Sequence, residues 1–566
     1  MSEFVSIVDR LCSHSHYAQR LVAANASFRD ELLAAYDRPF LRPEMEDILR
    51  VQAAQNPAGL RAVLRRLRQR VWLRVAARDL AGAADLQEVM ASTSDLAEVS
   101  IAAAQSFALG DLVERFGVPI GAESNSPQEL MVVAMGKLGG RELNVSSDVD
   151  LIFVYPEEGA TNGSRSISNH EFFNQLGKQI ISILTEATAD GFVFRVDMRL
   201  RPYGESGALT ISFPALESYF VTQGRPWERY AWIKARPISG VCHEELGALI
   251  KPFVFRRYLD YGAIGQIREL HRQIRAEVMR RDRIDNIKLG PGGIREIEFL
   301  AQVFQLIRGG RDARLQGRST LTTLSYLAQV NLLSQEHCAE LSESYVFLRN
   351  LEHRLQYLDD AQTHSLPTSA PDQARIAASL GEENFEGVLA ALKQHRECVA
   401  RQFDAMFELD VAETLSQATL FWQGALDDAQ ALKMFGDLGY RDAATVCERL
   451  RATRASSRYL QLPETSRARL DSLIPMLIET SGGMPHPDET LIRTTDLLEA
   501  VSRRETYLAL LRENDGALRK VQELASASAW AAQYLSQHPI LLDELLDHRE
   551  LAVAPDWPAL KLRLQH

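Results

Sequence analysis

"MGKLGGRELNVSSDVDLIFVY", residues Met135 to Tyr155, differs from the rest of this 566-residue sequence, most of which has the pattern of amphipathic helices. It contains paired glycines, a short polar turn and two aspartates one residue apart, and it ends in an apolar run. A short apolar run bounded by turn-forming residues is typical of a buried strand. The stretch therefore predicts a sheet within a largely helical protein, with Asp148 and Asp150 at the start of a strand.

The sequence around this stretch predicts the rest of a small α/β region. The run "ELMVVAMG", residues 129–136, predicts a strand before it. After it, Ser168 with Glu171 three residues later predicts a capped helix. "FVFRVDMRLRP", residues 192–202, alternates between apolar and polar residues and predicts a third strand. Helical patterns resume after about residue 246, so we expect an α+β fold that is mostly helical.

The overall composition is that of an ordinary globular protein, with 46% apolar and 24% charged residues. The net charge of −12 argues against a protein whose main task is to bind polynucleotide. The five cysteines are scattered and fit neither a zinc site nor a disulfide framework. The sequence does not begin like a signal peptide, and no window has 18 consecutive apolar residues. We therefore expect a cytoplasmic protein with reduced thiols and no membrane partner.

Residues 60–80 form one helical segment that is unusually rich in arginine, with seven. Its apolar residues recur at spacings of three and four, which predicts a buried stripe. The arginines could mark a nucleic-acid-binding helix, but arginines opposite an apolar stripe more often form a solvated or salt-bridged face. We expect the second arrangement and no nucleic-acid partner.

Three aspartates of the α/β region can form one acidic cluster. Residues i and i+2 of a strand point to the same face, so Asp148 and Asp150 project together. If the second and third strands are neighbours, Asp197 joins them, on a strand face that it shares with arginines. Three close carboxylates repel one another and need a cation to stay ionised. Such oxygen ligands suit Mg²⁺, and two ions about 3.5–4 Å apart can clamp the attacking and leaving oxygens of a phosphoryl transfer.

Residues beside these acids suit the phosphate groups of a nucleotide. Paired glycines let backbone N–H groups approach a phosphate, serines add hydroxyl donors, and arginines bind phosphate oxygens bidentately. A glycine pair or an Asp-x-Asp motif alone is a weak signal, but the whole order of strands, glycines and acids predicts metal-dependent nucleotidyl transfer. The candidate phosphate-binding residues are Lys137, Gly139, Gly140, Ser146, Ser147, Arg199 and Arg201.

This order of motifs resembles the nucleotidyltransferase superfamily related to DNA polymerase β, and five longer motifs resemble one family within it. That family is the bacterial bifunctional glutamine synthetase adenylyltransferase/adenylyl-removing enzymes. The motifs are "GKLGGRELNVSSDVDLIF", "FRVDMRLRPYGESGALTIS", "GRPWERYAWIKARPI", "IKLGPGGIREIEFLAQVFQLIRGGR" and "FLRNLEHRLQYLDDAQTHSLP".

The resemblance runs from about residue 15 to the C-terminus and implies a polymerase-β-like core among helical bundles. The expected domains are a helical segment (1–125), the nucleotidyltransferase core (126–245), a helical domain completing the catalytic half (246–425) and a helical regulatory or linker region (426–566).

The resemblance also implies an activity. Family members carry two nucleotidyltransferase domains: the N-terminal one removes AMP from a tyrosine of glutamine synthetase by phosphorolysis, giving ADP, and the C-terminal one attaches AMP from ATP. This sequence contains one copy, which matches the N-terminal one, and it ends at His566, about where the family continues to its second copy. We expect AMP removal with Asp148, Asp150 and Asp197 as catalytic and metal-binding residues and with two Mg²⁺ ions. The implied partners are glutamine synthetase, a PII-type signalling protein and glutamine as an effector.

Three other functions remain open at this point. ATP-dependent adenylylation would use the same kind of site, and the site residues do not separate the two directions. A non-catalytic scaffold that docks glutamine synthetase would have no need of three clustered aspartates. A polymerase-like enzyme acting on nucleic-acid ends is disfavoured by the acidic net charge.

Glu296 and Glu298, which follow the glycine-rich residues 290–293, could reach the site from the start of a helix. We expect instead that the glycines form a connector and that Arg295 and both glutamates are solvated.

A second helical motif, "LRNLEHRLQYL", places four charged or titratable residues within a turn and a half. We expect an ion-paired helix face rather than a ligand site, with a partner surface as the alternative. The four residues are Arg349, Glu352, His353 and Arg354.

Overall fold

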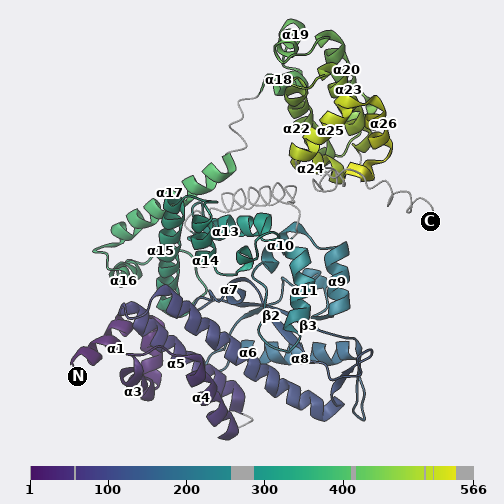
Figure 1. Cartoon of the computed structure of the whole chain (residues 1–566). Coiled ribbons are helices and arrows are strands. Elements are labelled where there is room, and N and C mark those ends of the chain that lie inside the picture. Colours follow the sequence, from purple (N-terminus) through teal and green to yellow (C-terminus); the bar gives the residue numbers. More distant parts are fainter. Residues whose placement is uncertain are drawn as a thin grey trace. The chain divides into compact units, whose positions relative to one another are not determined.

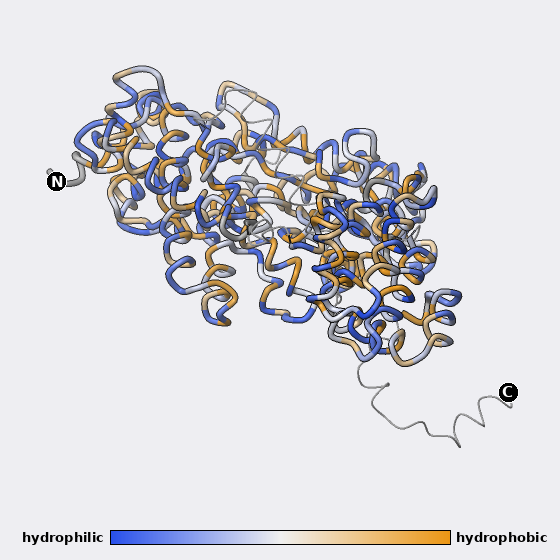
Figure 2. The backbone as a smooth tube through the Cα atoms, turned by 90° about the horizontal axis from the view of Figure 1, so that it is seen from above, coloured by the Kyte–Doolittle hydropathy of each residue, from blue (hydrophilic) through white to orange (hydrophobic). Residues whose placement is uncertain are grey.

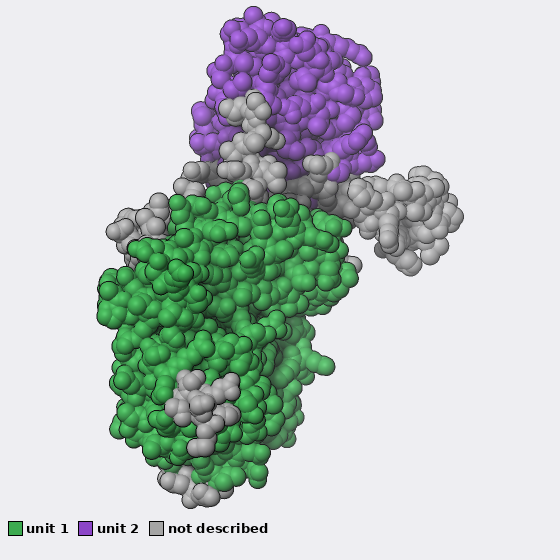
Figure 3. Space-filling view, turned by 90° about the vertical axis from the view of Figure 1, so that its left-hand side faces the viewer, with its two compact units in different colours: residues 1–406 green, residues 407–566 purple. Residues whose placement is uncertain are grey.

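The computed structural model of the chain describes residues 2–55, 59–255, 286–408, 416–502, 505–513 and 515–542. The described residues form an α+β fold that is mostly helical, as expected (Figure 1). The chain packs into two compact units, residues 1–406 and 407–566 (Figure 3), and each is described on its own. The boundaries expected near residues 125 and 245 both lie inside the first unit.

Helices form the N-terminal part of the first unit. They are α1 (Ser2–His14), α2 (His16–Ala24), α3 (Ala26–Ala35), α4 (Arg42–Gln55), α5 (Leu60–Leu80) and α6 (Leu86–Phe116). Side chains cap two of them: Ser15 accepts the N–H of Ala18 at α2, and Asp85 accepts that of Glu88 at α6. Apolar and polar residues alternate along the helices (Figure 2), so each helix can bury one side and expose another.

The arginine-rich helix α5 is more deeply buried than the sequence predicted. Arg68 and Arg78 are 4% and 5% exposed and form ion pairs with Asp360 and Glu88. Of the two expected arrangements, solvated or salt-bridged, the salt-bridged one is confirmed for these arginines, and both are buried because α5 packs against α1, α3, α4 and α6. Arginines that are buried and paired in this way do not form a surface for nucleic acid.

α6 is the one helix of the described residues that is long and apolar enough to cross a membrane by length and composition. Half of its most apolar window is buried. It packs against α5 and against α8 (Asn169–Thr185). Packing inside the protein therefore accounts for its apolar composition.

The first unit also contains a small mixed sheet with the strand order β5-β3-β2-β7, in which β6 pairs with β3 as well. Its strands are β2 (Met131–Ala134), β3 (Val149–Tyr155), β5 (Val196–Asp197), β6 (Thr210–Ser212) and β7 (Arg236–Pro237). β2 runs antiparallel to β3 and β7, whereas β5 and β6 run parallel to β3. β1 (Pro119–Gly121) and β4 (Gly159–Thr161) form a separate antiparallel pair.

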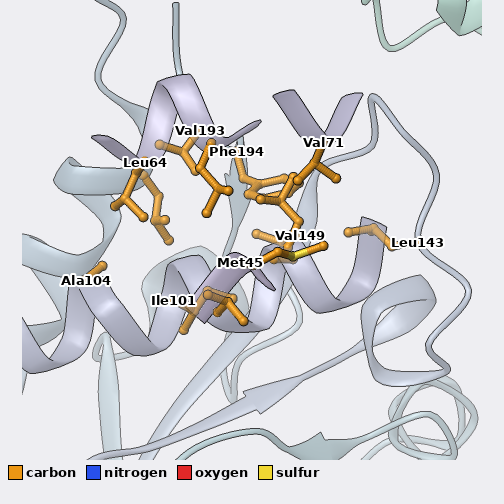
Figure 4. Packing of buried hydrophobic residues seen from close by; sticks show 14 of the residues in the cluster. Met45, Leu64, Val71, Ile101, Ala104, Leu143, Val149, Val193 and Phe194 are labelled. Carbon is orange, nitrogen blue, oxygen red and sulfur yellow. The ribbon is translucent and has the colours of Figure 1, made fainter. Parts of the chain in front are cut away.

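Both faces of the sheet are covered, which explains why its strands are continuous apolar runs rather than alternating ones. Alternate residues of β2 and β3 belong to two different apolar clusters. One cluster joins the sheet to α5, α6 and α8. The other joins it to α9 (Phe213–Thr222), α10 (Pro226–Trp232) and α11 (His243–Val254). Figure 4 shows Val149 and Phe194 of the α/β region beside Val71 of α5 and Ile101 of α6.

The predicted elements of the α/β region are confirmed except for the length of the third strand. β3 has the predicted bounds, and Ser168 caps α8 by accepting the N–H of Glu171 at 3.1 Å. The third strand was predicted over residues 192–202, but β5 has only two residues. After Asp197 the chain turns, and the N–H of Arg201 donates to the carbonyl of Met198. Arg199 and Arg201 therefore do not continue the strand face of Asp197, as the alternation had predicted.

Further helices follow the α/β region. They are α13 (Ile294–Arg308), α14 (Thr320–Gln329), α15 (Gln335–Asp359), α16 (Ala370–Leu380) and α17 (Phe385–Glu408). α15 is largely buried and packs against helices from both ends of the unit, among them α2, α6, α13 and α14. This helix connects the N-terminal helices to the α/β region.

The second unit is helical in its described residues and has an apolar core of its own. Its core residues include Phe435, Leu473, Leu491 and Leu498, all fully buried. The helices are α18 (Gln417–Gln423), α19 (Asp428–Asp437), α20 (Ala443–Ala455), α21 (Ser457–Leu460), α22 (Glu464–Ser481), α23 (Pro487–Val501), α24 (Glu505–Glu513), α25 (Asp515–Ala527) and α26 (Ala529–Gln537).

Candidate active site

The register of β3 and β5 places two of the predicted acids opposite one another. Asp150 on β3 pairs with Asp197 on β5, and neighbouring strands lie about 4.8 Å apart. Asp148 immediately precedes β3. The expectation that the second and third strands are neighbours is confirmed. We call Asp148, Asp150 and Asp197 the acid cluster.

The electrostatics of the acid cluster are unfavourable without a cation. The pKa of Asp150 is raised to about 7 because its carboxyl group is buried and because Asp148 and Asp197 lie close to it. Among the described residues, no side chain forms an ion pair or hydrogen bond with the Asp150 carboxylate. A bound cation would favour its ionised form.

Asp197 is bonded to an arginine. Its carboxylate accepts both the backbone N–H and the Nε–H of Arg199, each at 2.8 Å. Burial opposes ionisation of Asp197, but these bonds hold its pKa below the usual value. Within the described part of the chain, no three His, Cys, Asp or Glu side chains are grouped to hold a metal as they stand. The acid cluster fits a cation by position and by charge, and Asp197 would have to turn away from Arg199 to join in binding it.

The two glycines predicted to bind phosphate take part in a tight turn. α7 (Gly136–Gly139) follows β2, and the N–H groups of Gly139 and Gly140 donate to the carbonyls of Met135 and Gly136 at 2.9 and 3.1 Å. A Cβ on Gly139 would lie 1.9 Å from the carbonyl oxygen of Lys234. Gly139 therefore allows the chain before β7 to approach α7 closely, and both N–H groups are already used within the fold.

Gly136 is a residue of the site that the sequence analysis did not single out. It has a φ of +51°, and a Cβ there would lie 2.7 Å from Oδ2 of Asp150. A side chain at this position would therefore collide with the Asp150 carboxylate. The signal in the sequence was the first glycine of "GKLGG", immediately after the apolar strand.

The two serines before β3 differ in their surroundings. Ser146 is buried: its hydroxyl donates to Asp360 at 2.6 Å and its N–H donates to Gln356 at 3.2 Å. It thereby fixes the loop that precedes the acid cluster to the C-terminal end of α15. The hydroxyl of Ser147 lies 3.4 Å from Oδ1 of Asp148, so this serine is beside the acid cluster.

The two arginines after β5 are engaged with their own segment. The guanidinium of Arg201 donates to the carbonyls of Met198, Glu205 and Gly207 at 2.8, 3.1 and 3.3 Å and so stabilises the turn after the strand. Arg199 has a side chain that is 71% exposed, and it pairs with Asp197. A role for either arginine in binding phosphate stays a prediction.

A cavity of about 680 Å³ lies beside Asp150, and we call it the Asp150 cavity. Its volume is in the range typical of small-molecule sites. Its lining comes from six separate segments of the chain, so no short motif could have predicted it. The lining residues are Gly136, Lys137, Asp150, Leu200, Trp227, Tyr230, Ala231, Lys234, Lys288, Leu289, Arg295, Glu298, Phe299, Gln302 and His364.

The expectation that both glutamates are solvated is wrong, and Arg295 is partly buried. Glu296 is 3% exposed and accepts the N–H of Gly292 at 3.0 Å. Arg295 and Glu298 line the Asp150 cavity, and Oε1 of Glu298 lies 3.9 Å from Nζ of Lys234. The glycine-rich turn thus directs the start of α13 toward the cavity, and Glu298 shares its wall with Asp150.

The charged motif on α15 is confirmed as an ion-paired helix face. Arg349, Glu352 and His353 are fully buried, which excludes them as a partner surface. Glu352 accepts two bonds from Lys137 at 2.9 and 3.0 Å and lies 2.9 Å from Nδ1 of His364. We call Lys137, Glu142, Lys234, Arg349 and Glu352 the α15 network.

The α15 network also lies beside the cavity. Lys234 donates to Glu142 at 2.6 Å, and Nε of Arg349 lies 3.3 Å from Glu352. Burial lowers the pKa of Lys137 to about 7, although Glu352 opposes this change. Lys137, a predicted phosphate ligand, is therefore paired with a carboxylate of the protein at the edge of the cavity.

Comparison with known proteins gives two family matches and a set of relatives. Residues 5–248 match the family glutamate-ammonia ligase adenylyltransferase, and residues 268–407 match GlnD PII-uridylyltransferase. Three relatives carry the name bifunctional glutamine synthetase adenylyltransferase/adenylyl-removing enzyme. Those from Chromobacterium violaceum, Aromatoleum aromaticum and Nitrosomonas europaea are 51%, 51% and 48% identical over 559, 553 and 577 residues.

These alignments cover 99%, 98% and 100% of this chain and 62%, 59% and 62% of the relatives. The chain thus spans about three fifths of the length of the curated relatives that it matches. Over nearly its whole length, about half of its residues are identical to theirs. Nearly all of the chain is thus similar to part of the relatives named bifunctional glutamine synthetase adenylyltransferase/adenylyl-removing enzyme.

Proposed function

We propose that this chain removes AMP from an adenylylated tyrosine of glutamine synthetase by phosphorolysis and releases ADP. The observation that carries the proposal is the pairing of Asp150 with Asp197 beside a cavity that is large enough for a nucleotide and lined by four cationic side chains. The direction of the reaction rests on the family resemblance, in which the catalytic copy that follows the N-terminal helices removes AMP.

In this reaction an oxygen of inorganic phosphate attacks the phosphorus of the AMP–tyrosine diester. The bond from phosphorus to the tyrosine oxygen breaks, and a new P–O–P bond completes ADP. The proton of hydrogen phosphate ends on the tyrosine oxygen, so no general base of the protein is needed. Asp148, Asp150 and Asp197 would hold Mg²⁺, as two ions, and the metal would supply positive charge to stabilise the phosphoryl oxygens.

Other residues of the Asp150 cavity would position the nucleotide. Trp227, Tyr230 and Phe299 give it an aromatic wall on which an adenine ring can stack. The rings of Tyr230 and Phe299 lie 5.7 Å apart and are tilted, so they pack on one another as parts of one surface. Gly136 lets the backbone approach the Asp150 carboxylate closely, without a side chain between them.

The partners of the reaction are proposed from the same resemblance. We infer that glutamine synthetase is the protein substrate and that a PII-type signalling protein and glutamine regulate the reaction. The match of residues 268–407 to a family named PII-uridylyltransferase supports a link to PII signalling. We place the enzyme in the cytoplasm, where its protein substrate is made.

A direct assay tests the proposal. The purified chain is incubated with adenylylated glutamine synthetase, Mg²⁺ and phosphate, and ADP release is followed, with Asp150→Asn as the inactive variant. Asp30→Asn, at an exposed position of α3, is the matched control and should be as active as the wild type. If the wild type releases no ADP, or if the Asp150→Asn variant releases as much, the proposal fails.

A parallel reaction tests the opposite direction. It contains unmodified glutamine synthetase, Mg²⁺ and ATP labelled at the α-phosphate. We expect no transfer of label to glutamine synthetase. Transfer that depends on Asp150 would reassign this site to adenylylation.

A further inference from the structure

The cationic side chains that line the Asp150 cavity fall into two pairs. Lys137 and Lys234 belong to the α15 network and are neutralised by Glu352 and Glu142. Lys288 and Arg295 differ from them: among the described residues, neither side chain forms an ion pair or a hydrogen bond. Both are partly buried and line the cavity.

Several other partly buried cations among the described residues of this unit have partners. Arg236, for example, donates to Glu98 at 2.6 Å and to backbone carbonyls of α7 at 2.9 and 3.0 Å. Removing a charge from water is unfavourable unless an opposite charge or hydrogen bonds replace the lost hydration. Lys288 and Arg295 have no such direct partner among the described residues, and the cavity that they line is where an anion can enter.

The backbone holds these two residues together. The N–H of Arg295 donates to the carbonyl of Lys288 at 3.2 Å, so the two side chains start from adjacent points although they are seven residues apart. Asn286 accepts the N–H groups of Lys288 and Leu289 at 3.1 and 2.9 Å. Gly292 has a φ of +72°, and a Cβ there would lie 2.0 Å from the carbonyl oxygen of Arg396. This turn is thus fixed by backbone contacts before any ligand binds, which lowers the entropic cost of binding.

The pair also lies close to the acid cluster. Lys288 and Arg295 line the same cavity as Asp150. An anion bound between Lys288 and Arg295 would therefore be next to the place where the AMP phosphorus is proposed to bind.

We propose that Lys288 and Arg295 form a subsite for a phosphate group, which is the attacking inorganic phosphate before the reaction and the β-phosphate of ADP after it. This inference rests on the proposed function. The Arg295 guanidinium supplies a planar fork for two phosphate oxygens, and the Lys288 ammonium supplies a point charge. An oxygen of the phosphate held here forms the new P–O–P bond as the bond to the tyrosine oxygen breaks, and its proton leaves with tyrosine.

Binding measurements on the full chain in Mg²⁺ buffer test the subsite without requiring catalysis. Inorganic phosphate, ADP and AMP are compared, because AMP lacks the phosphate group that the subsite would bind. We expect the wild type to bind ADP more tightly than AMP. Lys288→Met and Arg295→Gln should each weaken the binding of phosphate and of ADP by roughly tenfold and should change AMP binding less than about twofold.

Two further variants control this measurement. Arg308→Gln removes an exposed arginine from the same helix and should change none of the three affinities. Lys288→Arg keeps the charge and should keep most of the preference for ADP. If the neutral variants do not fold, the affinities of Lys288→Arg for ADP and AMP can still be compared with those of the wild type.

The outcomes separate the subsite from the proposed function. An equal loss of ADP and AMP binding in Lys288→Met and Arg295→Gln would overturn the subsite, and so would a wild type that binds ADP no more tightly than AMP. If the variants lose the preference for ADP while the wild type releases no ADP from adenylylated glutamine synthetase, the subsite is supported and phosphorolysis is not.

Discussion

The first unit contains two groups of charged side chains that differ in whether the protein itself neutralises them. In the α15 network, Glu352 and Glu142 each accept a hydrogen bond from a lysine at 3.0 Å or less. In the acid cluster, Asp148 and Asp150 form no ion pair or hydrogen bond with a cationic side chain of the described residues, and three carboxylates lie close together. The two groups share the wall of one cavity, so burial alone does not distinguish them.

The difference shows how a structural charge can be told from a functional one. A buried charge that has its counter-ion within the fold stabilises the fold only when both partners are present. A buried charge without a counter-ion destabilises the fold until a ligand supplies one. Substitutions in the two groups should therefore have opposite effects on stability and activity.

Asp150→Asn should have the largest effect on activity and no unfavourable effect on stability. We expect ADP release to fall about 1000-fold, because the cation loses its buried ligand. The thermal unfolding temperature at pH 8 without Mg²⁺ should equal or exceed that of the wild type, because a repelled buried carboxylate has been removed. A clear drop in unfolding temperature would show that the acid cluster stabilises the fold, and it would contradict the proposed difference between the acid cluster and the α15 network.

Glu352→Gln should have the opposite profile. It leaves Lys137 and Arg349 buried without their carboxylate, so we expect a loss of about 3–5 kcal/mol in the free energy of unfolding. Glu397→Gln, at an exposed pair on α17, is the matched control and should change the free energy by less than about 0.5 kcal/mol. Equal unfolding temperatures for the two variants would contradict the structural role of the α15 network.

The affinity for Mg²⁺ should depend on pH through Asp150. Its pKa of about 7 means that binding a cation below pH 7 must displace a proton, so affinity should rise by about tenfold per pH unit up to pH 7 and then level off. Calorimetry in two buffers of different ionisation enthalpy would show proton release at pH 6 and little at pH 8. The Asp150→Asn variant serves as the control and should show a flat profile.

The same group makes the stability of the metal-free chain depend on pH. The pKa of Asp150 is higher in the folded chain than the ordinary value of 3.8, so the folded state binds the proton more tightly. Its contribution to stability is therefore complete at acidic pH and is lost as the pH rises through 7. Added Mg²⁺ should restore stability at pH 8, as measured by the unfolding temperature.

Arg199→Gln should have the smallest effect. The exposed Arg199 competes with a cation for Asp197, and exposed ion pairs contribute only about 0.2–1 kcal/mol. We expect Mg²⁺ to bind two- to threefold more tightly to the variant, as measured by the same calorimetry. A large loss of Mg²⁺ affinity would mean that Arg199 orients Asp197 for the metal instead of competing with it.

The parts of the site that follow from local pattern could be predicted from the sequence. The apolar run Val149–Tyr155 next to a polar turn is typical of a buried strand, and it became β3 with the expected bounds. The proximity of Asp150 and Asp197 followed once the two strands were taken as neighbours. The alternation after Asp197 was misleading, because the guanidinium of Arg201 bonds to three carbonyls of its own segment and makes a turn there.

The parts that depend on distant contacts could not be predicted. Glycines at 139 and 140 have the same local pattern whether they bind phosphate or allow close packing, and only the position of the Lys234 carbonyl shows that Gly139 packs closely. Arg295 and Glu298 follow a glycine-rich segment that is typical of an exposed connector. Their place in the Asp150 cavity depends on where α13 packs, which local sequence does not specify.

The bond between Lys137 and Glu352 joins residues that are 215 positions apart, and it limits where the chain can be divided. A fragment that stops near residue 245 would contain the strands and the acid cluster but would leave Lys137, Asn144 and Ser146 without their partners on α15 or just beyond its end. Exchange of catalytic segments between relatives should therefore keep residues 126–360 together. The boundary between the two compact units, after residue 406, is a better place to separate the protein into parts.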